Sequence, residues 1–116
     1  MQTNLERIYQ ILDGVLPSKV SYGTNVVDVD ETNILPFIVY QEISKRPVSY
    51  ADDRSVIRIS TIQITLVTEN KDQSIEQSLE EALYMNGYNY QMITEYLNDD
   101  DSVNRVYEIK MEESTL

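Results

Sequence analysis

The chain has 116 residues, 20 of them acidic and 9 basic, and its formal net charge at pH 7 is −11. This length suits one compact domain. Cysteine and histidine are both absent, which excludes disulfides, thiolate zinc sites and histidine-dependent catalysis. The strong negative charge disfavours tight binding to nucleic-acid phosphates and to anionic lipid surfaces.

The N-terminal segment lacks the features of a targeting signal. Residues 1–6 show no basic region followed by an apolar one, and no run of apolar residues approaches the roughly 18 that span a membrane. We therefore expect an intracellular protein that is neither secreted nor inserted in a membrane.

Helical periodicity opens the chain. Thr3 can cap a helix in which Glu6 stands three residues on, as in a capping box. Gly14 and Pro17 mark its end. The apolar residues at helical spacing are Leu5, Ile8, Tyr9, Leu12 and Leu16.

Residues 18–35 make a long connection after this helix. They contain a turn signal at 22–25, a short valine-rich run at 26–29 and an acidic patch at 28–31. A connection of this length inside a compact domain is expected to hold a short strand or to serve an interface.

Two strands follow. Residues 36–44 are rich in β-branched and aromatic side chains and apolar on both faces in their first half, which predicts a buried strand. Residues 56–68 form the next strand, but its isoleucines change face part-way along, so we expect a bulge or a bend near Ser60 and Thr61. The two sets are Ile57 with Ile59, and Ile62 with Ile64 and Leu66.

A second helix and two further strands complete the chain. Asp72 or Ser74 caps the helix and Gly87 ends it. Its apolar side comprises Ile75, Leu79, Ala82 and Leu83, while Glu76, Glu80 and Glu81 are expected to face away. The strands alternate Tyr88, Tyr90, Met92 and Tyr96, then Val103, Tyr107, Ile109 and Met111, with a turn at 98–102 and a loose tail at 112–116.

The element order is helix, strand, strand, helix, strand, strand. It predicts an α+β two-layer sandwich in a single domain covering residues 1–116, with a mixed or antiparallel four-stranded sheet and both helices on one face. Little protects the sheet edges, since Lys110 is the basic residue near the end of the last strand and Pro36 and Pro47 are the prolines near strands. We expect an edge to pair with another copy.

Two acidic constellations could suggest metal chemistry. Three consecutive aspartates, 99–101, could offer oxygens to a divalent cation, but they point in different directions and lack the glycine of a calcium loop, so a solvated turn is the better interpretation. Glu108 and Lys110 have the E-x-K spacing of metal-dependent nucleases, with Asp101 upstream. A solvent-facing strand explains that spacing equally simply. We expect no metal, no cofactor and no enzymatic activity.

The polar segment 45–55 lies between the first two strands, and arginine and tyrosine there are residue types that anchor protein interfaces. An exposed loop without partners is the alternative interpretation. The tyrosines of the third strand fit a core better than a contact surface.

The chain resembles the tail-completion or tail-terminator proteins, which cap the tail tube of long-tailed bacteriophages and join it to the head. The similar features cover nearly the whole chain. They are the N-terminal helix, the strand 35–44 with its proline-aromatic-valine-tyrosine start, the variable polar insertion 45–55, the long strand 57–68, the helix rich in Glu and Leu, and the closing hairpin that includes 105–109.

The resemblance implies a structural virion subunit that closes into a ring, expected to be a hexamer, at the tail end or neck, after assembly in the host cytoplasm. The implied partners are the major tail tube protein and the head-completion protein. Each subunit of a closed ring presents two different patches. Our candidate interaction residues, from the insertion and the C-terminal strand, are Arg46, Tyr50, Asp52, Asp53, Arg54, Lys110 and Met111.

Two other functions fit the sequence. The chain could be another neck or head-completion component of the same virion. It could instead be an acidic protein that binds a cellular partner or mimics DNA, since a charge of −11 on a small α+β unit suits such mimicry.

Overall fold

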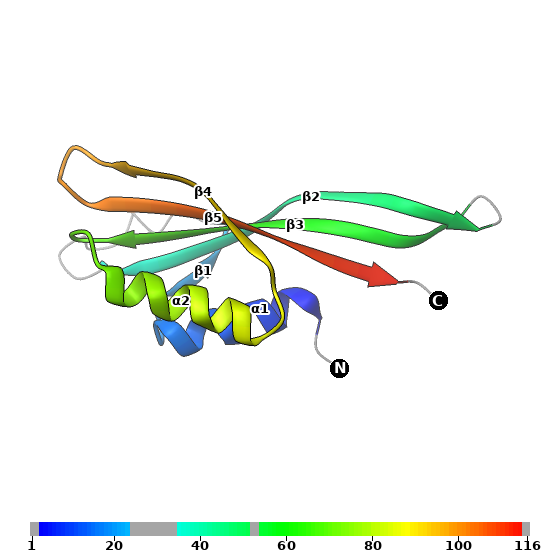
Figure 1. Ribbon diagram of the computed structural model, residues 1–116, viewed down its shortest axis with the longest axis horizontal. Coiled ribbons are helices and arrows are strands. Elements are labelled where there is room, and N and C mark those ends of the chain that lie inside the picture. The colour runs from blue at the N-terminus through cyan, green and yellow to red at the C-terminus, as the bar shows by residue number, and fades with distance from the viewer. Residues whose placement is uncertain (1–2, 24–34, 52–53, 115–116) are drawn as a thin grey trace.

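The computed structural model describes residues 3–23, 35–51 and 54–114, with backbone alone for 49–51, 54–56 and 114. The chain forms an α+β domain in which two helices cover one face of a five-stranded mixed sheet (Figure 1). The elements are α1 Asn4–Val15, β1 Val20–Tyr22, β2 Phe37–Ala51, β3 Arg54–Thr68, α2 Gln73–Met85, β4 Tyr90–Leu97 and β5 Val103–Ser114.

The strand order across the sheet is β1-β2-β3-β5-β4. β1 runs parallel to β2, and the other three pairs are antiparallel. The predicted class and mixed sheet are confirmed, but the predicted strand count of four is wrong. The fifth strand is β1, which lies in the segment 18–35 that was expected to hold a short strand or to serve an interface. The valine-rich run at 26–29 lies outside the described residues.

Both helices begin at the predicted caps. The Thr3 hydroxyl oxygen accepts a hydrogen bond from the Glu6 amide at 3.1 Å, and the Asp72 carboxylate accepts one from the Ile75 amide at 3.2 Å. These bonds satisfy amides of the first turn, which have no partner within the helix. Gly87 follows α2 with a φ of 86°, the left-handed conformation that glycine adopts without steric cost.

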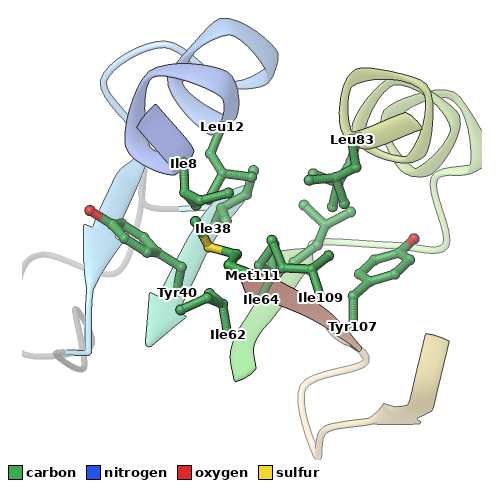
Figure 2. Close-up of a cluster of buried hydrophobic side chains, with 12 residues drawn as sticks. Ile8, Leu12, Ile38, Tyr40, Ile62, Ile64, Leu83, Tyr107, Ile109 and Met111 are labelled. Atoms are coloured by element: carbon green, nitrogen blue, oxygen red, sulfur yellow. The ribbon is translucent and has the colours of Figure 1, made fainter. Parts of the chain in front are cut away.

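The core lies between the two helices and the middle of the sheet. Figure 2 shows Ile8 and Leu12 of α1 and Leu83 of α2 directed at side chains of β2, β3 and β5. The twelve buried side chains of this cluster are Ile8, Leu12, Ile38, Tyr40, Ile62, Ile64, Leu66, Leu79, Leu83, Tyr107, Ile109 and Met111. Burial on this scale contributes most of the stability of a small domain.

The predicted bulge in β3 is wrong. β3 pairs with β5 without interruption from Ile57 to Thr68, whereas the irregularity lies in the partner strand β2, between Glu42 and Ser44. Because β3 stays regular, Ile57 and Ile59 remain on the face opposite the helices. The apolar residues of β3 thus lie on one face in the first part of the strand and on the helix-covered face in the second part.

The predicted loose tail is also wrong where the structure describes it. Residues 112–114 belong to β5 and pair with 57–59 of β3. Residues 115 and 116 lie outside the described residues. Pairing with β3 explains why this segment is a strand and not a loose tail, because the hydrogen bonds between the two strands satisfy its backbone groups.

Candidate interaction surface

β2 and β3 continue past both helices as a hairpin arm (Figure 1). We define the arm as residues 45–51 of β2 and 54–59 of β3, with 112–114 of β5 beside β3. The molecule measures 54 Å along its longest axis and 29 and 28 Å along the others. The predicted polar insertion 45–55 is therefore mainly paired strand and not a loop, because strand pairing satisfies backbone groups that a long loop would leave to solvent.

The seven predicted interaction residues do not form one cluster. Arg46 is exposed in the arm opposite Ile59. Tyr50 and Arg54 occupy the strand ends near the arm tip, where only their backbone is described, and Asp52 and Asp53 lie outside the described residues.

The two residues from β5 lie farther along the sheet. The ammonium of Lys110 donates a hydrogen bond to the Thr61 hydroxyl at 3.1 Å. Met111 is buried in the core, with 5% of its surface exposed, so its side chain is not available at the surface. Of the predicted set, Arg46, Tyr50 and Arg54 are placed in the arm.

Long stretches of the sheet edges carry no neighbouring strand among the described residues. Within the described ranges, β1 covers β2 only at 38–40, and no described strand pairs with the edge of β2 from Gln41 to Ala51. On the other side, β4 reaches β5 only up to Ile109, so the last residues of β5 form an edge as well. Open edges are surfaces to which another chain can add.

β4 is exposed along its whole length. All eight of its residues are exposed, so the predicted core role of the β4 tyrosines Tyr90 and Tyr96 is wrong, although Tyr88, just before the strand, packs against the core. The reason is the strand order, which places β4 at the sheet edge beyond β5. The large exposed apolar side chains of β4 are Tyr90, Met92, Ile93, Tyr96 and Leu97.

An ion-pair cluster ties α2 to β4 and β5. Arg105 of β5 reaches Glu95 at 2.8 Å and Glu80 at 3.0 Å, and its Nε donates a hydrogen bond to the Tyr107 hydroxyl at 2.6 Å. Tyr107 in turn donates to Glu80 at 2.6 Å. Lys71 bridges Glu76 and Glu95 at 2.8 Å each, so one network connects three elements and the turn before α2.

The network shifts the pKa values of its members. Burial alone raises the pKa of Glu80, but hydrogen bonds from Tyr107 and Arg105 outweigh it, so the net pKa is below the ordinary value. Hydrogen bonds from Lys71 and Arg105 lower the pKa of Glu95. Burial and the Glu80 carboxylate raise the pKa of Tyr107. At neutral pH, Glu80 and Glu95 are therefore charged and Tyr107 is neutral.

Glu76 was expected to face away from the core, and this expectation is wrong. It is 5% exposed, and its Oε2 is buried with no hydrogen-bond partner in the described part of the chain, while its Oε1 accepts a hydrogen bond from Lys71. Glu76 shares a flank of α2 with Leu79 and Leu83, at spacings of three and seven residues. Lys71 at 2.8 Å and Arg105 at 3.7 Å compensate the charge of the inward-facing Glu76 carboxylate.

Sequence reasoning missed this cluster, although a signal existed. Val103, Tyr107, Ile109 and Met111 were recognised as the inward positions of the last strand, and alternation places Arg105 in the same row. A charged residue in an apolar row needs a partner. The partners of Arg105 are glutamates of α2 and β4. The strand order determines which glutamates of the chain come close to it.

Three tyrosines line a hollow of about 390 Å³ between α1 and β1. The Tyr22 and Tyr40 rings meet edge to face with centroids 5.0 Å apart, and Tyr9 lies 6.5 Å from Tyr40. The Tyr22 hydroxyl accepts a hydrogen bond from the Glu42 amide at 3.3 Å, just beyond the last paired residue of β1. This contact protects a short piece of the β2 edge and leaves the arm edge unaffected.

The acidic constellations occupy separate places. Asp100 accepts hydrogen bonds from the amide and hydroxyl of Ser102, which stabilise the β4–β5 turn. Glu108 lies opposite Gln63 and Gln91 in the middle of the sheet, seven residues and about 20 Å of strand from Asp101. Among the described residues, no group of three or more acidic side chains is placed to hold a metal ion.

No helix within the described ranges is long and apolar enough to cross a membrane. A scan against protein-family models and a search of curated proteins both found no match to this chain.

Proposed function

We propose that this chain is a structural subunit of a long-tailed bacteriophage virion that closes into a ring, caps the tail tube and joins it to the head. The proposal begins from the resemblance of its element order and strand sequences to tail-terminator proteins. The geometric observation that carries it is the hairpin arm, which projects from the helix-covered half of an elongated molecule.

A closed ring needs two different contact surfaces on each subunit. The arm is one such surface, and β4 at the opposite edge of the sheet is a second one with exposed apolar side chains. Neither surface is needed to complete the core, because the buried cluster is assembled from the helices and the middle of the sheet. A fold in which two exposed surfaces are not needed for the core suits a subunit of an assembly.

The charge also supports this function. A ring at the tail end surrounds the path of the genome, and a subunit with a net charge of −11 repels the DNA phosphates instead of retaining them. The exposed aspartates of the β4–β5 turn contribute to this charge at the surface. Acidity thus favours passage of DNA.

The test is removal of the chain from the phage that encodes it. An amber codon at Tyr50 in a non-suppressing host is expected to yield DNA-filled heads and separate tails, and the wild-type chain supplied in trans is expected to restore joined particles. Electron microscopy of the lysate counts the two products. Infectious, fully joined particles in the absence of the chain would contradict the proposed function.

A labelling experiment distinguishes a tail-tube cap from another neck component. The purified chain, tagged and added to the separated tails, is expected to bind at the tube end and leave the heads unlabelled. Labelling of the heads alone would instead assign it to head completion. A salt-sensitive complex with a basic nucleic-acid-binding protein, together with normal virions, would favour DNA mimicry.

A further inference from the structure

Three separate elements bring tyrosines to the hollow between α1 and β1. Tyr22 of β1 and Tyr40 of β2 are partners in the parallel register, and their rings touch on the helix-covered face of the sheet. Tyr9 comes from α1, and its ring lies 6.5 Å from that of Tyr40. We call this place the tyrosine hollow. Its described lining residues are Leu5, Glu6, Tyr9, Gln10, Tyr22 and Tyr40.

The three rings are steeply inclined to one another and differ in exposure. The planes of Tyr22 and Tyr40 meet at 80°, and those of Tyr9 and Tyr40 at 42°. Tyr40 is 7% exposed and forms the floor, and Figure 2 shows it extending out of the core beside α1. Tyr9 and Tyr22 are 41% and 45% exposed and form accessible walls. Inclined rings around a hollow are the pattern of an aromatic cage, whose electron-rich faces attract a cation.

A carboxylate adds to this preference for positive charge. Of the six described residues that line the tyrosine hollow, Glu6 is the charged one. It stands one helical turn before Tyr9, so the two side chains are neighbours on the surface of α1. The Thr3 hydroxyl donates a hydrogen bond to Glu6 Oε1 at 3.1 Å. The hollow thus combines aromatic faces with a negative group, in a chain whose net charge is −11.

The basic side chains closest in sequence do not line the hollow. The Arg7 guanidinium lies 5.7 Å from the centre of the Tyr88 ring, and Arg7 lines a different hollow, between α1 and α2. Lys19, just before β1, is not part of the lining. Residues 24–34, which follow β1, contain no lysine or arginine. The cation that suits the tyrosine hollow is therefore expected from another molecule.

An arginine side chain fits both features of the lining. Its planar guanidinium stacks on aromatic rings and donates hydrogen bonds to a carboxylate. A quaternary ammonium ion fits the rings but has no hydrogen to donate to Glu6. A free amino acid would bring its own carboxylate, and no cation lines the described part of the hollow to receive it. Arginine within a polypeptide chain has neither disadvantage.

We propose that the tyrosine hollow binds the guanidinium group of an arginine side chain that a protein partner presents. The tyrosine rings contact the guanidinium plane, and the Glu6 carboxylate accepts its N–H groups. This inference goes beyond the proposed function, because the site is formed within one subunit and is the same whichever protein supplies the arginine.

Titration of the full chain with N-acetyl-arginine amide tests the proposal. Two-dimensional NMR of ring-labelled tyrosines is expected to show saturable shifts for Tyr9, Tyr22 and Tyr40, with a Kd of about 1 mM, and no shift for the exposed Tyr84 of α2. N-acetyl-citrulline amide has nearly the same shape without the charge. It is expected to bind at least about tenfold more weakly, because the ring faces and Glu6 select a cation.

Substitutions locate the binding. Tyr9→Leu and Tyr22→Leu each remove one ring and are expected to weaken binding by about threefold to fivefold. Glu6→Gln removes the charge but keeps an acceptor oxygen, and about a threefold loss is expected. Tyr84→Leu and Glu81→Gln are the matched controls, because both residues are exposed on α2 outside the lining, and they should leave the affinity unchanged. Circular dichroism verifies the folding of every variant.

Four outcomes overturn the inference. They are equal affinity for the arginine and citrulline amides, no saturation up to about 100 mM arginine amide, wild-type affinity in all three folded lining variants, and tighter binding of tetramethylammonium or of free L-arginine. The last result would assign the hollow to a small cation or to the amino acid. Tail-end labelling and head joining are measured separately, so the capping function stands or falls independently of these titrations.

Discussion

The helix-covered half of the sheet and the arm are built from the same three strands, β2, β3 and β5, yet different forces hold them. In the covered half, Ile62, Ile64 and Leu66 of β3 are at most 1% exposed beneath α1 and α2. In the arm, Ile57 and Ile59 lie on the other face and are only half-buried. Strand pairing without helix cover keeps the arm formed and leaves its surface available.

The electrostatic interactions of the two regions differ in the same way. Arg105 in the covered half is 17% exposed and is surrounded by glutamates and a tyrosine hydroxyl. Lys45 in the arm is 40% exposed, and its ion-pair partner among the described residues is Glu113, at 3.5 Å. Water therefore screens the arm pair and leaves the cluster in the covered half strong. Charge contributes to stability in one region and is available for recognition in the other.

The largest contrast is expected from shortening apolar side chains. Leu83→Ala removes a fully buried side chain of α2 and should lower the free energy of unfolding by about 2–5 kcal/mol, because it leaves a cavity in the core. Val48→Ala in the arm should change it by less than about 0.5 kcal/mol. Urea denaturation monitored by circular dichroism measures both. Equal losses would show that the arm is part of the core.

Removing Arg105 from the ion-pair cluster is expected to have the next largest effect on the free energy of unfolding. Arg105→Ala leaves Glu80, Glu95 and Tyr107 without their main partner and should cost about 2 kcal/mol of unfolding free energy. Lys45→Ala, the matched change in the arm, should cost less than about 0.5 kcal/mol. Urea midpoints of the two variants compare them. A cost for Lys45→Ala as large as that for Arg105→Ala would contradict the distinction.

The same cluster predicts a pH dependence. The folded pKa values of Glu80 and Glu95 lie below their ordinary values. Their contribution to stability is therefore complete above the ordinary glutamate pKa of about 4.3 and is lost as pH falls through the folded pKa values. Arg105→Ala should reduce this acid-side loss. A variant whose stability falls with acid as steeply as that of the wild type would remove the cluster as its cause.

Amide exchange compares the regions with no substitution. The amides of Arg46 and Val48 in the arm are expected to exchange faster than those of residues 62–66, because the arm can open without disrupting the core. Mass spectrometry of peptic fragments resolves the two segments. Uniform protection throughout β2 and β3 would mean that the sheet opens as one unit.

The smallest effect on stability is expected at the arm surface. On the proposed function, Arg46→Ala with Arg54→Ala should leave the thermal midpoint nearly unchanged and impair ring formation and tail joining, because arginine is a residue type that anchors protein interfaces. Differential scanning calorimetry and electron microscopy supply the two measurements. Normal assembly of tails with this pair removed would show that the arm is not the interface.

Local sequence determined the starts of the helices and the strand segments. Thr3 and Asp72 supply capping oxygens within three residues of the amides they bind, so near neighbours suffice to place α1 and α2. The β-branched runs placed β2 and β3 and thereby the apolar rows of the core. These features depend on contacts between residues close in the chain, or on a period that every strand shares.

Tertiary structure decided what those rows face. Whether β4 is central or at an edge depends on the path of α2 across the sheet, so exposure of Tyr90 and Tyr96 and burial of Glu76 could not be derived from periodicity. The same holds for Arg105, whose partners are 10 to 29 residues away in sequence. Local preference sets the direction of a side chain relative to its own strand or helix, but the neighbour it meets is fixed only when distant segments pack together.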